Sequence, residues 1–375
     1  MRIIADDKIP YLKGILEPYA EVVYLPGTSI DAKAVKNADA LIVRTRTICN
    51  KALLEGSNIK FIATATIGFD HIDTQWCEQN GIIWTNAPGC NSGSVMQYIA
   101  LVLVYLSKKH NFRFEDKTLG VVGVGNVGWK IVRLAEALGM RVVMNDPPVV
   151  RQRGICGYVS LEGLLREADI ITLHVPLNYE EIDKTYHLFD STLISKTLPG
   201  SILINSSRGE VVDNAALHEF IDNKHLLGAV LDVWENEPNI DIELLKKLDI
   251  ATPHIAGYSA DGKETATKMS VLALSRFFRL GLEWKQSDIQ KPLNQQFILD
   301  CDGKDIQEII SQAIEMTYNI ENDDYTLRND VSLFEKHRGN YPLRREFFAY
   351  NVSLKNGSKA IRDSLKILGF KINEE

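Results

Sequence analysis

The feature that most constrains the fold is an alternation between short β-rich apolar runs and polar or helical stretches, which occurs twice along the chain. Runs of this kind are typical of strands buried on both faces. Strands that alternate with helices form a parallel sheet covered by helices, so the sequence predicts the α/β class. In residues 1–92 the predicted strands are Ile3–Ala5, Val22–Leu25, Ala40–Val43, Phe61–Thr64 and Ile82–Trp84.

The second alternation runs from Leu119 to Pro253. A long apolar helix is predicted before it, over Ser94–Lys108, and an amphipathic helix without proline after it, over Ala260–Leu282. This second series predicts another parallel-sheet domain. Its predicted strands are Leu119–Val122, Arg141–Met144, Ile170–Leu173, Ile202–Asn205 and Gly228–Leu231.

Beyond Glu283 the character of the chain changes. Lys285–Pro292 is polar, as expected of a linker, and a smaller unit follows it. There Phe347–Val352 suits a strand and Ala360–Leu368 a closing helix. We therefore expect a small α+β domain at this end. One face of a further predicted helix carries Ile306, Ile309, Ile310, Ala313 and Ile314.

Length, composition and charge exclude several classes of protein. A chain of 375 residues is too long for one ordinary core, and 45% hydrophobic with 24% charged residues is typical of globular proteins. A net charge of −7, with Lys and Arg spread along the chain, disfavours nucleic-acid binding. The longest apolar run, Ile99–Leu106, is far shorter than the roughly 20 residues that span a bilayer. We expect neither a nucleic-acid nor a membrane partner.

The cysteines and the first residues bear on the compartment. There are five cysteines, an odd number without a Cys-x-x-Cys pair, which disfavours a disulfide framework and a zinc site. Met1–Asp7 lacks the apolar stretch of a signal peptide. The sequence therefore predicts a cytoplasmic protein without a metal site. The cysteines are Cys49, Cys77, Cys90, Cys156 and Cys301.

A glycine turn follows the predicted strand Leu119–Val122 and opens a helical pattern. Glycines in such a turn permit a tight bend, close approach of a pyrophosphate and packing of the helix on the sheet. The pyrophosphate would lie on free N–H groups at the helix N-terminus. The alternative is an ordinary strand–turn–helix that happens to use glycine. The predicted cofactor loop comprises Gly123, Gly125, Asn126, Val127 and Gly128.

Asp146 lies close to the ~20 residues beyond the glycines at which a ribose-binding carboxylate is expected. Its carboxylate would accept hydrogen bonds from the ribose hydroxyls and repel a 2′-phosphate, which favours NAD over NADP. Arg151 and Arg153 are basic and would instead favour the 2′-phosphate of NADP. Asp232, after a later strand, could bind the nicotinamide carboxamide or merely cap a turn.

Three residues could carry out the oxidation of a hydroxy acid. His254 suits the base that takes the hydroxyl proton, because imidazole titrates near neutral pH. Glu237 could fix the tautomer of that imidazole and stabilise its charged form. Arg208 could hold a carboxylate through two parallel hydrogen bonds. The plainer alternatives are a structural histidine, a solvated loop carboxylate like Glu235, and a surface ion pair.

These three candidates each follow a predicted strand. Successive strands of an open parallel sheet end at one edge, which is where such folds bind ligands. We therefore expect Arg208, Glu237 and His254 to lie close together.

The chain resembles the D-isomer-specific 2-hydroxyacid dehydrogenases across residues 1–282. The resemblance rests on the glycine turn with Asp146, on Ile171–Leu177, and on the stretches around Arg208, Glu237 and His254. It implies two similar Rossmann- or flavodoxin-like domains with the active site between them. Residues 1–92 and 260–284 would bind substrate, 93–259 would bind NAD, and 285–375 would serve dimerisation.

The resemblance also implies roles for individual residues. Arg208, Glu237 and His254 would be the catalytic set. Substrate would be contacted by Thr45, Thr66 and Tyr258. Further cofactor contacts would come from His174, Ser206, Ser207, Asp232 and Gly257.

The resemblance implies that the substrate is a small phosphorylated hydroxy acid, and the sequence agrees with a phosphate. Arg44 and Arg46 flank Thr45 just after a predicted strand, so two cations and a hydroxyl could receive a phosphate. Both arginines would point the same way only if the strand extends that far, and a solvated strand end is the alternative. The family members most similar to this chain act in pyridoxal 5′-phosphate biosynthesis as homodimers. Arg344 or Arg345 could then reach a partner subunit's site.

Two alternatives stay open. Another enzyme with the same machinery, such as a 3-phosphoglycerate dehydrogenase or a glyoxylate enzyme, has the same fold. The C-terminal segment does not resemble the amino-acid-binding module that many 3-phosphoglycerate dehydrogenases carry. An NAD-sensing binding protein would keep the glycine loop but would not need Arg208, Glu237 and His254 together.

Overall fold

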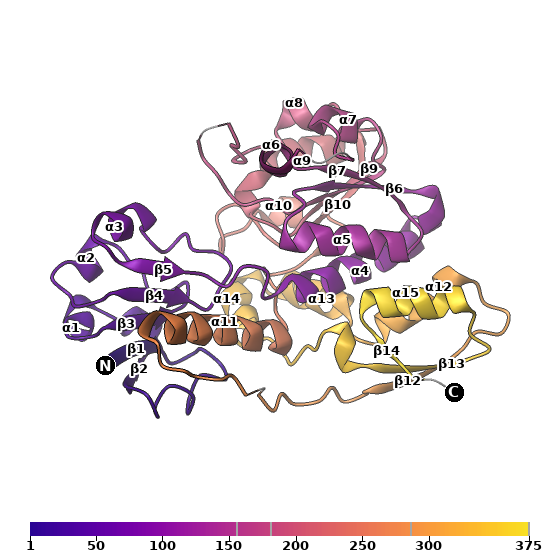
Figure 1. The fold of residues 1–375 in the computed structure, drawn as a ribbon. Coiled ribbons are helices and arrows are strands. Elements are labelled where there is room, and N and C mark those ends of the chain that lie inside the picture. The colour runs from indigo at the N-terminus through magenta and orange to yellow at the C-terminus, as the bar shows by residue number, and fades with distance from the viewer. Residues whose placement is uncertain (155–156, 181, 286, 374–375) are drawn as a thin grey trace. The chain divides into compact units, whose positions relative to one another are not determined.

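The computed structural model describes residues 1–154, 157–180, 182–285 and 287–373 (Figure 1). It divides into two compact units, one formed by Met1–Asn91 with Ser259–Gln290 and the other by Ser92–Tyr258 with Lys291–Glu375. Cys156 lies outside the described residues. The other four cysteines are free thiols. Nowhere in the described ranges does a helix combine the length and apolarity needed to cross a membrane.

The first unit is built on a five-stranded parallel sheet in the order β2-β1-β3-β4-β5, and the five strands predicted here are confirmed. The last helix of the unit, α11 (Ala260–Phe278), packs Val271 and Leu274 into the core beside Phe61. It ends before the predicted Leu282, because Arg279 adopts a left-handed conformation with φ 57°. The strands are β1 Arg2–Asp6, β2 Glu21–Leu25, β3 Ala40–Val43, β4 Phe61–Thr64 and β5 Ile83–Thr85; the short helices are η1 Gly27–Ser29, α1 Ala32–Val35, α2 Lys51–Leu54 and α3 Thr74–Gln79.

The second unit contains a six-stranded parallel sheet in the order β11-β10-β9-β8-β6-β7. Helices α4 and α5 cover one face, and α7, α8 and α9 cover the other (Figure 1). All five strands that were predicted with a range are confirmed. The strand expected before His254, for which no range was predicted, is β11 and has only two residues. The strands are β6 Thr118–Val122, β7 Arg141–Asn145, β8 Ile170–Leu173, β9 Ser201–Asn205, β10 Leu226–Leu231 and β11 Ile250–Ala251. The helices are α4 Ser92–Lys109, η2 Phe114–Asp116, α5 Asn126–Ala137, α6 Pro147–Arg153, α7 Leu161–Leu165, α8 Ser191–Ile194, η3 Gly209–Val211, α9 Asn214–Asp222 and α10 Ile242–Leu245.

The strands of this sheet are apolar on both sides because each face has its own core. In β9, Ile202 and Ile204 join the cluster under α4 and α5, whereas Leu203 joins the cluster under the helices of the other face. Successive side chains of a strand point to opposite faces, so a doubly covered sheet needs an unbroken apolar run.

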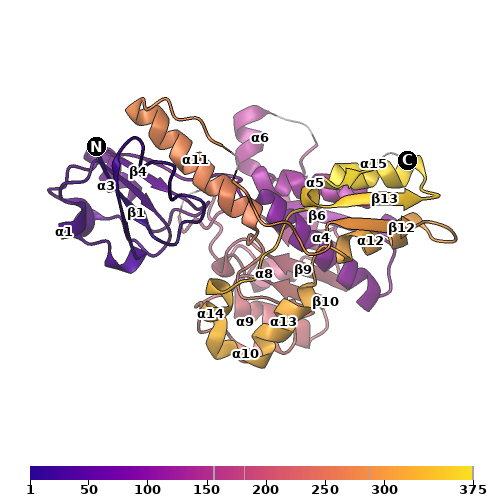
Figure 2. The ribbon, with the colours of Figure 1, turned by 90° about the horizontal axis from the view of Figure 1, so that it is seen from below.

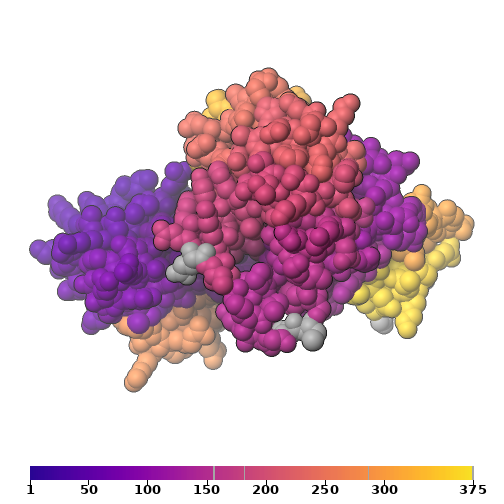
Figure 3. Space-filling model, turned by 90° about the horizontal axis from the view of Figure 1, so that it is seen from above, coloured from indigo at the N-terminus to yellow at the C-terminus, as the bar shows by residue number. Residues whose placement is uncertain are grey.

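Residues 291–373 add a three-stranded parallel sheet in the order β12-β13-β14. Helices α12 and α15 lie between this sheet and α4 and α5, and the cores merge (Figure 1). In the space-filling view the yellow C-terminal residues pack directly against the purple to magenta part of the chain (Figure 3). The elements are β12 Gln296–Asp300, α12 Ile306–Glu315, α13 Ile320–Asn329, η4 Val331–Leu333, α14 Phe334–Gly339, η5 Phe347–Ala349, β13 Asn351–Lys355, α15 Lys359–Leu368 and β14 Lys371–Ile372.

Two details of this C-terminal region differ from expectation. The predicted strand Phe347–Val352 is partly wrong, because its first three residues form the 3-10 turn η5 and β13 begins only at Asn351. Helix α13 was not predicted. It lies along β11 and α10, where Arg328 donates from Nη1 to the Leu245 carbonyl at 2.6 Å (Figure 2).

The register of the six-stranded sheet positions the functional loops. The last residues of its strands pair across the sheet, so the loops that follow leave from one edge. The aligned strand ends are Asn145, Val122, Leu173, Asn205, Leu231 and Ala251.

Candidate active site

The glycine turn has the geometry that a dinucleotide needs. Gly123 has a φ of +84°, and a Cβ there would lie 2.6 Å from the His174 carbonyl oxygen. A Cβ on Gly128 would lie 1.9 Å from the carbonyl oxygen of Gly123. In contrast, a Cβ on Gly125 would meet no atom within 4 Å. The first and third glycines are therefore required by the turn and by helix packing, while the second keeps the backbone accessible to a pyrophosphate.

Helix α5 begins directly after Gly125, and no side chain caps its N-terminus. The first N–H groups of a helix lack partners within the helix, and together with the helix dipole they favour an anion. The turn thus fits the pyrophosphate of NAD, with Gly125, Asn126 and Val127 as the residues that would hold it.

Asp146 ties the glycine turn to the next helix. Its Oδ2 accepts a hydrogen bond from the Val124 amide at 2.8 Å, and its Oδ1 accepts one from the Val149 amide at 3.0 Å. Each carboxylate oxygen keeps capacity for a ribose hydroxyl. Arg151 forms an ion pair with Asp183. Because the charge of Arg151 is already paired, Arg151 is a weaker candidate for binding the 2′-phosphate of NADP.

The side chains after β8 and β9 are polar and partly buried. The Nε2 of His174 lies 2.9 Å from the Thr172 hydroxyl, and burial lowers the pKa of His174 to about 3, so its ring is neutral. Ser207 donates from Oγ to Asn205 Oδ1 at 2.8 Å. The Ser206 hydroxyl is buried without a hydrogen-bond partner in the described part of the chain. Buried hydroxyls normally have a partner, so Ser206 suits a ligand contact.

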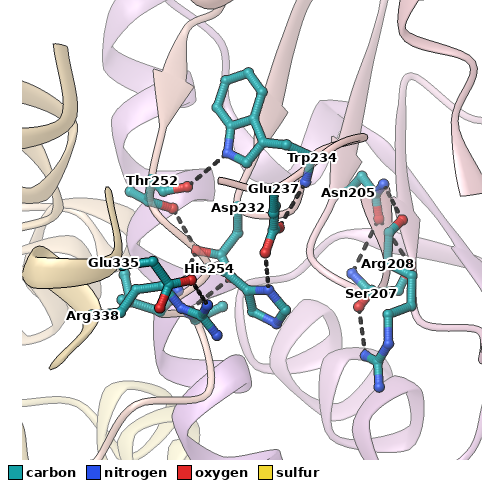
Figure 4. A network of polar contacts seen from close by, with 12 residues as sticks. Asn205, Ser207, Arg208, Asp232, Trp234, Glu237, Thr252, His254, Glu335 and Arg338 are labelled. Atoms are coloured by element: carbon teal, nitrogen blue, oxygen red, sulfur yellow. Dashed lines mark hydrogen bonds and ion pairs between the residues drawn. The ribbon is translucent and has the colours of Figure 1, made fainter. Parts of the chain in front are cut away.

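His254 and Glu237 form the predicted pair. His254 Nδ1 lies 2.8 Å from Glu237 Oε2, and the other carboxylate oxygen accepts from the Trp234 amide at 2.9 Å (Figure 4). Burial alone would raise the pKa of Glu237, but the hydrogen bond and charge of His254 outweigh burial and lower it. The carboxylate is therefore ionised and fixes the ring so that Nε2 exchanges the proton.

His254 belongs to a strained loop, Thr252–Tyr258, which we call the catalytic loop. Its φ of +57° is in the left-handed region. Asp232 holds this conformation: its carboxylate accepts from the Ile255 amide at 2.8 Å and from the Ala256 amide at 2.9 Å, and its carbonyl accepts from the His254 amide at 2.7 Å.

Asp232 is 1% exposed, and burial raises its pKa. Of the two roles considered for Asp232, binding the turn is the one observed. Its contact with the nicotinamide carboxamide stays a prediction, as does the cofactor contact of Gly257.

Arg208 lies on the loop after β9. Its Nη1 donates to the Ser207 carbonyl at 2.8 Å, and its own carbonyl accepts from Asn205 Nδ2 at 2.8 Å. A Cβ on the following Gly209 would lie 2.0 Å from the carbonyl carbon and oxygen of Trp234. The loop of Arg208 therefore packs on the loop that carries Glu237. Figure 4 shows the bonds of Arg208 to its own loop on one side and the Glu237–His254 pair on the other, both at the strand ends.

Glu235 is not a solvated carboxylate as sequence reasoning assumed. Its Oε1 lies 2.7 Å from His187 Nε2, and its Oε2 accepts from the Asn214 amide at 2.9 Å. Glu235 thus anchors the loop next to Glu237. No group of three or more His, Cys, Asp or Glu side chains in the described ranges could hold a metal ion.

The predicted substrate residues of the first unit lie at the ends of β3 and β4. Strand β3 stops at Val43, so the condition for Arg44 and Arg46 to point the same way is not met. Arg44 donates to the Lys8 carbonyl at 3.2 Å, and Thr45 and Arg46 are exposed.

Thr66 lies in a local hydrogen-bonded network. Its hydroxyl is 2.7 Å from that of Thr64, and it donates to the Gly68 carbonyl at 2.8 Å. The substrate contacts of Arg44, Thr45, Arg46 and Thr66 stay predictions.

Sequence reasoning missed that the C-terminal region supports the catalytic loop. Arg344 is only 3% exposed and donates from Nη2 to the Ala256 carbonyl at 2.5 Å. The prediction that Arg344 reaches a partner subunit is therefore wrong; that for Arg345 stays a prediction. Tyr341 lies edge-on to Tyr258 at 5.8 Å between centroids. The sequence offered one signal for this role. Basic residues cluster at 336–338 and 344–345, in a segment of otherwise mixed composition.

Comparison with known proteins agrees with this geometry. Residues 105–256 match the model of the D-isomer specific 2-hydroxyacid dehydrogenase NAD-binding domain, and residues 292–369 match a domain of unknown function. An erythronate-4-phosphate dehydrogenase of Bacteroides thetaiotaomicron is 49% identical over 353 residues, covering 94% of this chain and 99% of that protein. The chain belongs to the D-isomer-specific 2-hydroxyacid dehydrogenase family.

Further relatives define how much of the chain the family shares. An erythronate-4-phosphate dehydrogenase of Proteus mirabilis is 39% identical over 374 residues, covering 99% of both chains. A D-lactate dehydrogenase of Aquifex aeolicus, solved with NAD and lactic acid, has a TM-score of 0.62 and 28% identity, and it covers 75% of this chain and 96% of its own. A 3-phosphoglycerate dehydrogenase of Entamoeba histolytica with bound NAD has a TM-score of 0.64 at 26% identity, covering 76% and 99%.

The family match makes this chain an NAD-dependent dehydrogenase. The two sets of relatives differ in coverage. The erythronate-4-phosphate dehydrogenases match nearly the whole chain, whereas these solved structures match about three quarters of it. A chain that is similar to the former over its full length therefore shares their C-terminal region as well.

Proposed function

We propose that this protein oxidises 4-phospho-D-erythronate to 2-oxo-3-hydroxy-4-phosphobutanoate with NAD, a step of pyridoxal 5′-phosphate biosynthesis. The observation that carries the proposal is the His254–Glu237 pair, with Nδ1 and Oε2 2.8 Å apart, on two neighbouring loops at the sheet edge that also carries Arg208. Full-length similarity to erythronate-4-phosphate dehydrogenases supports the choice of substrate.

The mechanism assigns one task to each side chain. NAD supplies the acceptor for the hydride that leaves C2. His254 takes the proton of the C2 hydroxyl at Nε2, so that the C2–O bond becomes a carbonyl. Glu237 stabilises the imidazolium that forms. Arg208 holds the substrate carboxylate and the developing carbonyl by charge-assisted hydrogen bonds.

The remaining assignments are proposals of the same kind. Residues 1–92 and 260–284 bind substrate, and 93–259 bind NAD through the glycine turn, Asp146, His174, Ser206 and Ser207. Residues 285–375 form a homodimer contact, in agreement with the 67% exposure of Ile298 on the sheet of that region. Sedimentation velocity would refute the dimer if it gave a monomer at micromolar concentration. A cytoplasmic location agrees with the free thiols.

A spectroscopic assay tests the function. The purified protein is mixed with NAD and 4-phosphoerythronate, and NADH absorbance is followed. A parallel reaction contains an oxo acid, in case reduced cofactor stays bound. Erythronate and 3-phosphoglycerate are the comparison substrates. We expect 4-phosphoerythronate to give the highest kcat/KM by a wide margin.

Other results would point elsewhere. Preference for 3-phosphoglycerate would support a different enzyme of the family. Equal turnover of all three compounds would refute a phosphate-specific site. NAD binding without turnover of any of them would favour an NAD-sensing protein.

A further inference from the structure

Arg338 acts on the charge of Glu237 in the reacting pair, although it comes from the region whose family model describes a domain of unknown function. It is carried by α14, and its guanidinium carbon lies 5.9 Å from the ring centroid of Tyr258 at the end of the catalytic loop. Figure 4 shows Arg338 and Arg208 on opposite sides of the His254 ring. Two cations therefore flank the candidate base.

The surroundings of Arg338 leave part of its guanidinium unsatisfied. Nη1 donates to Glu335 at 3.1 Å, but Nε is buried and has no hydrogen-bond partner within the residues described. The Arg338 side chain is only 22% exposed, whereas that of Glu335 is 40% exposed. A largely buried guanidinium with an unpaired donor is costly unless an anion completes its hydrogen bonds.

The charge of Arg338 is nevertheless maintained. Burial alone would lower the pKa of Arg338, but Tyr258 and Glu237 hold it above its ordinary value. The guanidinium offers a planar array of five N–H donors, which matches the oxygens of a phosphate.

The proposed substrate has an anion at each end of a four-carbon chain. C2, where the chemistry occurs, is bonded to the carboxylate carbon, so a carboxylate on Arg208 places C2 next to His254. The rest of the chain then extends past the ring, away from Arg208. We propose that Arg338 binds the substrate phosphate and thereby selects phosphorylated over unphosphorylated hydroxy acids. This inference rests on the function proposed above.

The test compares two substrates across variants. Arg338→Gln removes the positive charge, and Arg338→Lys keeps the charge but loses the planar array of N–H donors. Lys336→Gln removes a charge from the exposed side of the same helix. We expect Arg338→Gln to lower kcat/KM for 4-phosphoerythronate by roughly tenfold to a hundredfold, as a lost charge-assisted hydrogen bond would. Its kcat/KM for erythronate should stay within about twofold of the wild-type value on the same scale. Arg338→Lys should recover part of the loss, and Lys336→Gln should resemble wild type.

A second readout does not depend on turnover. Titration calorimetry of the NAD-loaded protein with inorganic phosphate should show binding that Arg338→Gln weakens by about tenfold or more. If wild type oxidises none of the substrates, the proposed function fails, and calorimetry still decides whether Arg338 binds phosphate. Melting temperature and NAD affinity show whether a variant is misfolded. If Arg338→Gln is misfolded, Arg338→Lys is compared with wild type in its place.

Several outcomes would overturn the proposal. An equal fall for both substrates would make Arg338 a positioning residue for the catalytic loop. No fall for either substrate would remove it from the site. A phosphate-specific loss in Arg44→Gln but not in Arg338→Gln would assign the phosphate to the first unit. Unaltered phosphate binding in Arg338→Gln would contradict the inference directly.

Discussion

The acid–base pair is the most specific feature at the scale of single residues. The lowered pKa of Glu237 keeps its carboxylate ionised beside the His254 ring. Oxidation requires the neutral imidazole, so kcat/KM falls on the acidic side of the pH profile. In Glu237→Gln the imidazolium loses its anionic partner and the ring takes up a proton less readily. The acidic limb should therefore move to lower pH, and kcat should fall roughly a hundredfold or more.

The measurement is kcat/KM against pH for wild type and Glu237→Gln. Glu235→Gln is a matched control. Glu235 lies on the same loop as Glu237, but its carboxylate pairs with His187 instead of His254. A profile of Glu237→Gln that superimposes on the wild-type profile would remove Glu237 from the proton transfer.

Sequence reasoning identified His254, Glu237 and Arg208 from their chemistry and from the family motifs around them. It expected them to lie together because strand ends of a parallel sheet meet at one edge. It assigned Arg344 to a partner subunit's site and missed its bond to a carbonyl 88 residues earlier, since contacts of that separation leave no pattern in spacing. It also misjudged Glu235, because nothing in the sequence links that carboxylate to His187.

At the scale of elements, the catalytic loop is held from two directions. Asp232 binds its amides from the end of β10, and Arg344 binds the Ala256 carbonyl from the C-terminal region. Arg344→Met should leave that carbonyl unpaired and lower the unfolding free energy by about 1–3 kcal/mol. Because the loop positions His254, kcat should also fall by about tenfold, with little change in NAD affinity.

Denaturant unfolding and steady-state kinetics check this prediction. Arg362→Met is the control: Arg362 also donates to a backbone carbonyl, that of Gly357 at 2.6 Å, but within the C-terminal region itself. If both variants lose kcat equally, Arg344 contributes general stability and does not position the loop.

The pattern of elements was predictable wherever strands are long apolar runs, as in Ile202–Asn205 or Phe61–Thr64. The two-residue strand β11 carries too little pattern to be distinguished, and β13 starts late because Phe347–Ala349 form a 3-10 turn. Helices α13 and α14 are polar and short, so the docking of α13 on β11 and of α14 on α13 depends on tertiary contacts that the sequence does not display.

At the scale of the molecule, the C-terminal region is part of the second unit rather than an appendage. Its helices α12 and α15 share one apolar core with α4 and α5. The same region supplies Arg344 to the catalytic loop and places Arg338 beside Tyr258. The region whose family model describes a domain of unknown function therefore supports the catalytic loop.

The proposed oxidation depends most directly on His254 as the base. In His254→Ala, initial-rate NADH formation from 4-phosphoerythronate should fall by about a hundredfold to ten-thousandfold, the usual contribution of a general base. NAD affinity should be retained, and His218→Ala on α9 should behave as wild type. Undiminished turnover by His254→Ala with intact NAD binding would contradict the assignment.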